Sequence, residues 1–115
     1  MNYLEIKTLL TAIDDPVLKL ETVMDLGKQL SPTPQHSACT EISGCASRVQ
    51  ICKSGGLFYG TADSALVRGV VAVILAMAND GIRDLRGEFE SLKLNLGAGR
   101  LNGVNSMINY FENVI

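Results

Sequence analysis

The chain has 115 residues, of which 47 % are apolar, 5 % aromatic and 19 % charged, and this predicts one domain over residues 1–115 with an aliphatic core. The formal net charge of −2 argues against a nucleic-acid binder, because such proteins carry a surplus of basic residues on one face. The longest apolar run, residues 69–78, is too short to span a bilayer, and no secretory signal opens the chain, so we expect no membrane partner.

Two helices are predicted in the first third of the chain. Apolar residues recur near helical spacing in residues 2–13, which predicts the first helix. Asp15 is a good N-cap and Pro16 suits the first position of the second helix, which ends before the Ser-Pro-Thr-Pro sequence at 31–34. The expected core faces are Leu4, Leu9, Leu10 and Ile13 in the first helix and Val17, Leu20, Val23 and Met24 in the second.

The middle of the chain changes to the period of a strand. Residues 48–53 alternate polar and apolar, which predicts a strand with one buried face. The turn signal Ser54-Gly55-Gly56 follows, and residues 57–61 are predicted to form the antiparallel partner. Residues 39–42 are a weaker third strand. If this strand pairs as well, residues 43–47 connect it to 48–53 and Cys45 lies at the tip of the connection.

Three further helices are predicted after the strands. Residues 65–78 are apolar nearly all round apart from Arg68, so we expect a central buried helix, capped by Asp63 or Ser64 and stopped by Asn-Asp-Gly at 79–81. A short charged helix is expected over residues 84–91, and a last one from about residue 98 to the C-terminus. The expected core face of the last helix is Leu101, Val104, Ile108, Phe111 and Ile115. The predicted class is α+β, with a small antiparallel sheet of about three strands packed with helices.

The cysteines and the single histidine carry most of the chemical information. Three cysteines are an odd number, which fits poorly with a secreted disulfide framework and favours the cytoplasm. Their spacings of six and seven residues argue against a zinc or thioredoxin-like site. Cys52 is interpreted as a small hydrophobe within its strand and Cys39 as an inert thiol, although a site near Cys45 across the hairpin stays open for Cys39. His36 is expected to be solvated in its loop.

The sequence SGCASRV at residues 43–49 gives Cys45 an unusual setting. Gly44 permits an unusual backbone turn before it, and Ser47 lies among the small residues that leave its sulfur uncrowded. Arg48 would favour the thiolate, which is the nucleophilic form of cysteine. These residues support a reactive and an inert thiol equally.

Three other polar positions stand out. Asp63 is best interpreted as a helix N-cap. Arg68 lies in an otherwise apolar helix and needs a hydrogen-bond partner or a route to solvent. Arg100 stands at the start of the last helix, where the helix dipole disfavours a cation.

Four segments resemble the SufE/CsdE-type sulfur acceptor proteins, in that family's order. They are LETVMDLGKQL at 20–30, GCASRV at 44–49, ADSALVRGVVAVIL at 62–75 and GRLNGVNSMI at 99–108. The resemblance implies a compact α+β fold of the SufE/IscU type. It also implies that Cys45 takes the outer sulfur of a persulfide on a cysteine desulfurase, stimulates that enzyme, and passes the sulfur to an iron–sulfur cluster scaffold.

The resemblance also assigns supporting positions. Gly44 and Ser47 match the motif around the acceptor cysteine, beside Arg48, and Asp63, Arg68 and Arg100 match polar residues of the later segments. No metal and no cofactor of its own are implied, because the pyridoxal phosphate belongs to the desulfurase. We expect a monomer or weak dimer, and a sulfur-transfer protein rather than a stand-alone enzyme.

Departures from the family pattern keep two alternatives open. Gln50 replaces a bulky apolar residue, Thr61 and Ala62 replace a more acidic and hydroxylated pair, and the chain is shorter around residues 79–99. One alternative is an IscU-like iron–sulfur scaffold, which three cysteines within fourteen residues disfavour. The other is a module that docks to a desulfurase without transferring sulfur.

Overall fold

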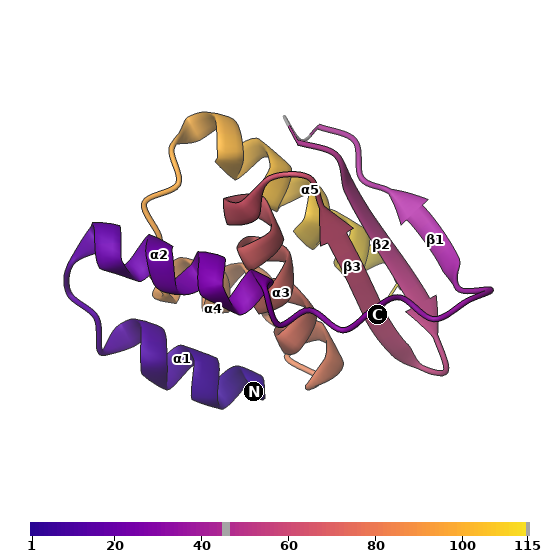
Figure 1. The fold of residues 1–115 in the computed structure, drawn as a ribbon, viewed down its shortest axis with the longest axis horizontal. Coiled ribbons are helices and arrows are strands. Elements are labelled where there is room, and N and C mark those ends of the chain that lie inside the picture. The colour runs from indigo at the N-terminus through magenta and orange to yellow at the C-terminus, as the bar shows by residue number, and fades with distance from the viewer. Residues whose placement is uncertain (45–46, 115) are drawn as a thin grey trace.

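The computed structural model describes residues 1–44 and 47–114 (Figure 1). Within this part of the chain, five helices and three strands form the α+β arrangement that the sequence predicts. In chain order they are α1 (Tyr3–Thr11), α2 (Pro16–Gly27), β1 (Ala38–Glu41), β2 (Val49–Ser54), β3 (Leu57–Ala62), α3 (Ala65–Asn79), α4 (Leu85–Ser91) and α5 (Ala98–Val114).

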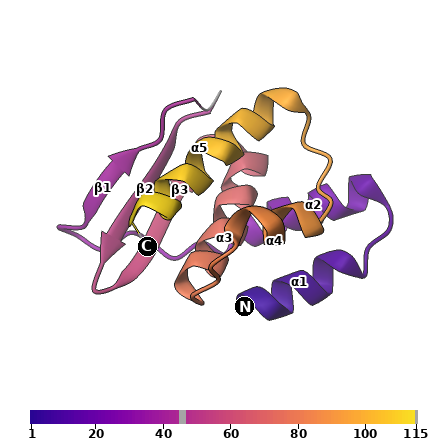
Figure 2. The same ribbon diagram turned by 180° about the vertical axis from the view of Figure 1, so that it is seen from behind.

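The sheet is antiparallel throughout, with the order β1-β2-β3. Gly55 and Gly56 make the tight turn between β2 and β3 with φ of 60° and 81°, a backbone that glycine adopts without steric cost. Val49 and Ile51 of β2 are fully buried and, with Phe58 of β3, form the core face of the sheet. α3 and α5 cover this face, as seen from behind in Figure 2.

α3 is the central helix of the core, as its apolar sequence predicts. Its Gly69 packs so closely on α2 that a Cβ atom there would collide with the backbone carbonyl of Val23. On the α2 side, a Cβ at Gly27 would lie 2.6 Å from the Gly69 nitrogen. Glycine is therefore required at this crossing, where the two helix backbones are in contact.

The buried faces of α1 and α2 differ from those predicted. Tyr3, Ile6 and Leu10 are the buried residues of α1, whereas Leu4 is 70 % exposed. In α2, Val23 and Leu26 are buried, but Val17 is 65 % exposed. Each helix has more apolar residues than one face can hold, so packing against the neighbouring elements, not spacing alone, selects the face that is buried.

α1 is tied to α4 by a polar cluster. The Tyr3 hydroxyl donates to Glu88 Oε2 at 2.8 Å, and Lys7 Nζ lies 3.0 Å from the same oxygen. Hydrogen bonds from Lys7 and Tyr3 lower the pKa of Glu88, while burial and the neighbouring Glu88 raise the pKa of Tyr3 well above its ordinary value. Glu88 therefore acts as an ionised acceptor that joins the two helices.

In α5, Val104, Ile108 and Phe111 are buried as predicted, but Leu101 is 44 % exposed. Gly103 and Met107 complete the buried face of this helix. The predicted core residue Ile115 lies outside the described residues. In the described part of the chain, none of the helices combines the length and apolar character needed to cross a membrane.

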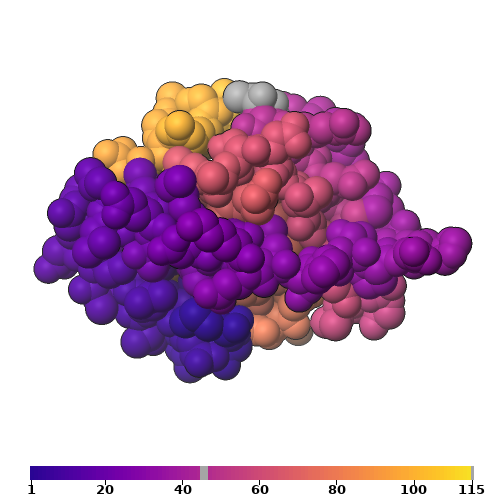
Figure 3. Space-filling view, in the orientation of Figure 1, coloured from indigo at the N-terminus to yellow at the C-terminus, as the bar shows by residue number. Residues whose placement is uncertain are grey.

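The segment between α2 and β1 crosses the face of the sheet that points away from the core (Figure 1). Ser31 and Thr33 from this segment line a hollow together with Gly60 and Thr61. The space-filling view shows the segment as a ridge whose far end projects from the body (Figure 3). His36, in this region, is exposed, as expected, and has a φ of 64°.

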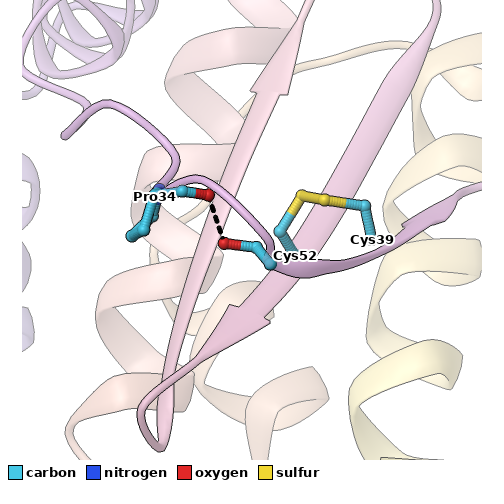
Figure 4. Close-up of a disulfide and its surroundings, with 4 residues drawn as sticks. Pro34, Cys39 and Cys52 are labelled. Carbon is cyan, nitrogen blue, oxygen red and sulfur yellow. Dashed lines mark hydrogen bonds between the residues drawn. A yellow bond between two sulfur atoms is a disulfide. The ribbon is translucent and has the colours of Figure 1, made fainter.

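Cys39 and Cys52 are joined by a disulfide with an S–S length of 2.03 Å (Figure 4). The interpretation of Cys39 and Cys52 as separate inert thiols is therefore wrong, although Cys52 is buried as predicted, at 1 % exposure. The register of β1 and β2 places the two residues directly opposite one another, with Cα atoms 4.0 Å apart. Both lie about equally far along the chain from Cys45, which is compatible with this pairing but does not by itself fix the register of the two strands.

Candidate functional site

The connection between β1 and β2, residues 42–48, is the candidate site and is called the 42–48 loop below. Its base is closed by a hydrogen bond from the Ile42 N–H to the Val49 carbonyl, at 2.9 Å. Ile42 is 7 % exposed and Val49 is fully buried, so both ends of the loop are anchored in the core. Cys45, the predicted acceptor, lies outside the described residues.

The first limb of the loop lies against α5. Gly44 has a φ of 88°, which confirms the expectation of an unusual backbone at this position. A Cβ atom at Gly44 would lie 2.6 Å from the hydroxyl oxygen of Ser106. Glycine is needed here for two reasons, because a side chain would strain the backbone and would also press on α5.

The second limb is tied to the start of α3. The Arg48 carbonyl accepts a hydrogen bond from the Asp63 N–H at 3.1 Å, which extends the β2–β3 pairing beyond both strands. The Arg48 side chain points to solvent and its Nε lies 3.2 Å from Glu41 Oε1, in an exposed ion pair. Such a pair stabilises little and leaves the guanidinium free to turn toward a partner.

A cavity of about 170 Å³ lies between the loop, α3 and α5. Arg100 lies at this cavity and donates from Nη1 to the Leu96 carbonyl at 3.1 Å, so its side chain is held at the first turn of α5. The lining residues are Ser47, Ser64, Val67, Val70, Leu96, Gly99, Arg100, Gly103, Val104 and Met107. Most of them are apolar, and the hydroxyls of Ser47 and Ser64 add polar atoms near the loop.

Asp63 differs from its expected role, whereas Arg68 agrees with the expectation stated for it. Ser64, not Asp63, is the N-cap of α3, because its hydroxyl accepts from the Val67 N–H at 3.4 Å. The preferred interpretation of Asp63 as the cap is therefore wrong. Arg68 finds the partner that its apolar helix requires: Nε and Nη2 both donate to the Ala62 carbonyl, at 3.2 and 3.1 Å.

The structure thus brings some of the predicted site residues together and separates others. Ser47 and Arg100 share the cavity beside the loop. Arg68 lines a different hollow with Gly27, Lys28 and Thr61. Ser64, named from the sequence only as a possible helix cap, lines the same cavity as Ser47. Ser106 lies against Gly44 and was not singled out from the sequence, although it belongs to the segment 99–108 that resembles the family.

The described residues around this loop contribute hydroxyl groups and, from Arg100, a cation. Within residues 1–44 and 47–114, His, Cys, Asp and Glu side chains form no group of three suited to a metal ion. Cys39 and Cys52 are joined to one another, so their sulfurs are not free thiolates. Exchange at a sulfur atom is the reaction class that the remaining cysteine of this loop can carry out.

Comparison with known proteins finds one matching family model and relatives that are similar over most of the chain. The SufE family model, an Fe-S metabolism associated domain, matches residues 4–114. An uncharacterized SufE-like protein of Rhizobium meliloti (strain 1021) is 32 % identical over 105 residues, which cover 75 % of this chain and 74 % of the relative. The sulfur acceptor protein CsdE of Escherichia coli (strain K12) is 31 % identical over 104 residues, which cover 77 % of this chain and 71 % of that protein.

Proposed function

The chain belongs to the SufE family, as its motifs indicated, and from this premise we propose that it is a sulfur acceptor for a cysteine desulfurase. The observation that carries the proposal is the position of the G-C-x-S sequence. The described residues on either side of Cys45 belong to a loop anchored at Ile42 and Val49, in which Gly44 lies against α5 and Ser47 lines a cavity. The sulfur acceptor CsdE, similar over most of the chain, supports the same role.

In the proposed reaction the Cys45 thiolate attacks the outer sulfur of a cysteine persulfide on the desulfurase. The sulfur–sulfur bond of that persulfide breaks, the outer sulfur stays on Cys45, and the desulfurase cysteine leaves as a thiolate. A second exchange of the same kind passes the sulfur to an iron–sulfur cluster scaffold. By emptying the desulfurase of its persulfide, the first exchange also stimulates turnover of that enzyme, which holds the pyridoxal phosphate.

We assign supporting roles to the two arginines near the loop. Arg48 is exposed and forms a surface ion pair with Glu41, so it is available to an acidic or thiolate group of a docking partner. Arg100 is held at the cavity by the Leu96 carbonyl and contributes positive charge that favours a thiolate or a persulfide anion. The apolar lining of the cavity would shelter such an anion from water and from competing thiols.

The proposal includes a cytoplasmic location and action as a monomer or weak dimer. The IscU-like scaffold is less well supported, because a scaffold requires several cysteine thiolates and the Cys39–Cys52 bond leaves neither as a ligand. The docking-module alternative makes the same contacts with a desulfurase but leaves Cys45 without sulfur, so a direct assay of Cys45 separates the two.

The test is to incubate the protein with a cysteine desulfurase and cysteine and to locate added sulfur by mass spectrometry. We expect sulfur on Cys45 in the wild type and in a Cys39→Ser/Cys52→Ser double variant, and none at position 45 after Cys45→Ser. Absence of sulfur from Cys45 with a competent desulfurase would contradict the acceptor function. Iron and sulfide that produce a stable coloured protein would favour the scaffold instead.

A further inference from the structure

The Cys39–Cys52 disulfide is not used by the proposed sulfur transfer. It joins two strands at a position where the backbones themselves exchange no hydrogen bonds. Ile42 and Val49 form a hydrogen-bonded pair, so alternation along an antiparallel ladder makes the pair three residues away a non-hydrogen-bonded one. The Cα separation of 4.0 Å agrees with the close spacing of such pairs.

The two sulfurs of this bond differ in access. Cys52 is 1 % exposed, and the segment that leads into β1 passes in front of its strand in the view of Figure 4. Cys39 is exposed, as are the other three residues of β1. A thiolate must approach the attacked sulfur along the line of the disulfide, and exposed Cys39 is the residue of this pair that offers such an approach from solvent.

We infer that Cys39 and Cys52 form a second thiol-exchange site, in which exposed Cys39 is the entry point for thiol reductants and buried Cys52 is the resolving cysteine. A reductant thiolate attacks the Cys39 sulfur, the disulfide breaks, and Cys52 leaves as a thiolate and takes up a proton. A second reductant thiol then attacks the mixed disulfide on Cys39. The products are two cysteine thiols and one oxidised reductant, so the electrons balance.

This site lies away from the 42–48 loop. Three residue steps of strand separate the Cys39–Cys52 pair from the Ile42–Val49 pair, about 10 Å at the usual rise of a strand. The disulfide therefore acts on sulfur transfer through the number of available thiols and not through direct contact with the base of the loop. In the oxidised chain two of the three cysteines are consumed, which leaves Cys45.

The consequence for sulfur transfer rests on the proposed function. In the reduced chain, exposed Cys39 is a second thiolate that can attack the outer sulfur of the desulfurase persulfide. The sulfur then stays on Cys39 and the desulfurase cysteine leaves as a thiolate, so part of the sulfur is diverted from Cys45. The redox state of the Cys39–Cys52 pair thus determines whether sulfur goes to Cys45 alone or is shared between Cys45 and Cys39.

The first experiment uses thiol chemistry alone and does not depend on sulfur acceptance. The Cys45→Ser variant is equilibrated with glutathione disulfide, and its cysteines are mapped by peptide mass spectrometry without reduction; a Cys39–Cys52 bond is expected. In reduced Cys45→Ser protein with either Cys52→Ser or Cys39→Ser added, we expect glutathione disulfide to react with Cys39 more than about tenfold faster than with Cys52, forming a mixed disulfide and releasing one glutathione thiolate. No bond, or equal coupling rates, would overturn the inference.

The second experiment follows the sulfur. Oxidised and reduced wild type each receive a desulfurase that already carries its persulfide and has been freed of cysteine, because cysteine is itself a thiol reductant. We expect sulfur on Cys45 alone in the oxidised protein and on both Cys39 and Cys45 in the reduced protein. Sulfur confined to Cys45 in both states would overturn the diversion, whereas no sulfur on Cys45 in either state would overturn the proposed function instead.

Discussion

Strand β3 is held at its edge of the sheet by α3 and by side-chain hydrogen bonds, whereas β1, at the opposite edge, is held by β2 and a disulfide. The Asn79 side chain accepts from the Phe58 N–H at 2.8 Å and donates to the Phe58 carbonyl at 3.0 Å, as a neighbouring strand would. Arg68 satisfies the Ala62 carbonyl at the other end of β3. All four residues of β1 are exposed.

The two edges are therefore held in different ways: the β3 edge by packing and side-chain hydrogen bonds, and the β1 edge by a covalent bond. An unpaired sheet edge is a template for unwanted strand pairing, and at β3 side chains of α3 occupy the backbone groups that would accept another strand. β1 buries too little to be held by packing, so the Cys39–Cys52 bond supplies the constraint instead. The 42–48 loop follows directly on β1, the strand at this second edge.

Of the changes that test this difference between the two edges, loss of the disulfide is expected to lower stability most. Reduction, or the Cys39→Ser/Cys52→Ser double variant, should lower the free energy of unfolding by about 3 kcal/mol, the chain-entropy value for a closed loop of this length. Denaturant unfolding measures the loss, and amide hydrogen exchange locates it. The Thr40 amide in β1 should lose protection while the Phe58 amide in β3 keeps it; equal protection of β1 in both states would show that the bond does not hold this edge.

Adding a methyl group where α2 and α3 cross, behind β3, is expected to have the next largest effect on stability. Gly69→Ala places a methyl group against the Val23 carbonyl, a backbone atom that cannot move aside, and should cost about 2 to 3 kcal/mol. Gly99→Ala is the matched control, because it is also a helical glycine and its Cβ would meet nothing within 4 Å. Thermal unfolding of the two variants tests this, and equal midpoints would mean that the α2–α3 contact is not close.

Removal of the side-chain cap on β3 is expected to have a smaller effect. Asn79→Ala leaves the N–H and carbonyl of Phe58 to water and should lower the free energy of unfolding by about 1 kcal/mol. Asn113→Ala, at an exposed position near the end of α5, controls for loss of an amide side chain. Faster exchange of the Phe58 amide only in Asn79→Ala would support the cap, and unchanged exchange would exclude it.

The surface ion pair at the end of β1 is expected to matter least for stability. Glu41→Gln removes the partner of Arg48, and since the two side chains are 59 % and 68 % exposed, unfolding should change by less than about 0.5 kcal/mol. A larger loss, measured by denaturant unfolding at low salt, would show that this pair and not the disulfide holds the β1 edge.

The sequence could predict the elements because their signals are local. Pro16, the two glycines of the β2–β3 turn and the apolar run of α3 each restrict the backbone within a few residues. All eight helices and strands therefore occur close to the predicted positions. The G-C-x-S loop was located for the same reason, since it lies between two strand patterns.

The sequence alone could not predict how these helices and strands pack against one another. Leu4 and Val17 were expected in the core but are exposed, because α1 and α2 bury the faces that fit their neighbours. Arg68 was expected to need a hydrogen-bond partner or a route to solvent, but the sequence could not show that the partner is the Ala62 carbonyl of β3.

Cys39 and Cys52 illustrate the limit of prediction from local sequence patterns. The sequence by itself determined the order and type of the elements and the position of Cys45 between two strands. Only the tertiary structure decided that Cys39 and Cys52 face one another and that Ser47 and Arg100 share a cavity. The physical reason is that a helix or turn depends on neighbouring residues, whereas a disulfide or a cavity depends on register and packing between distant segments.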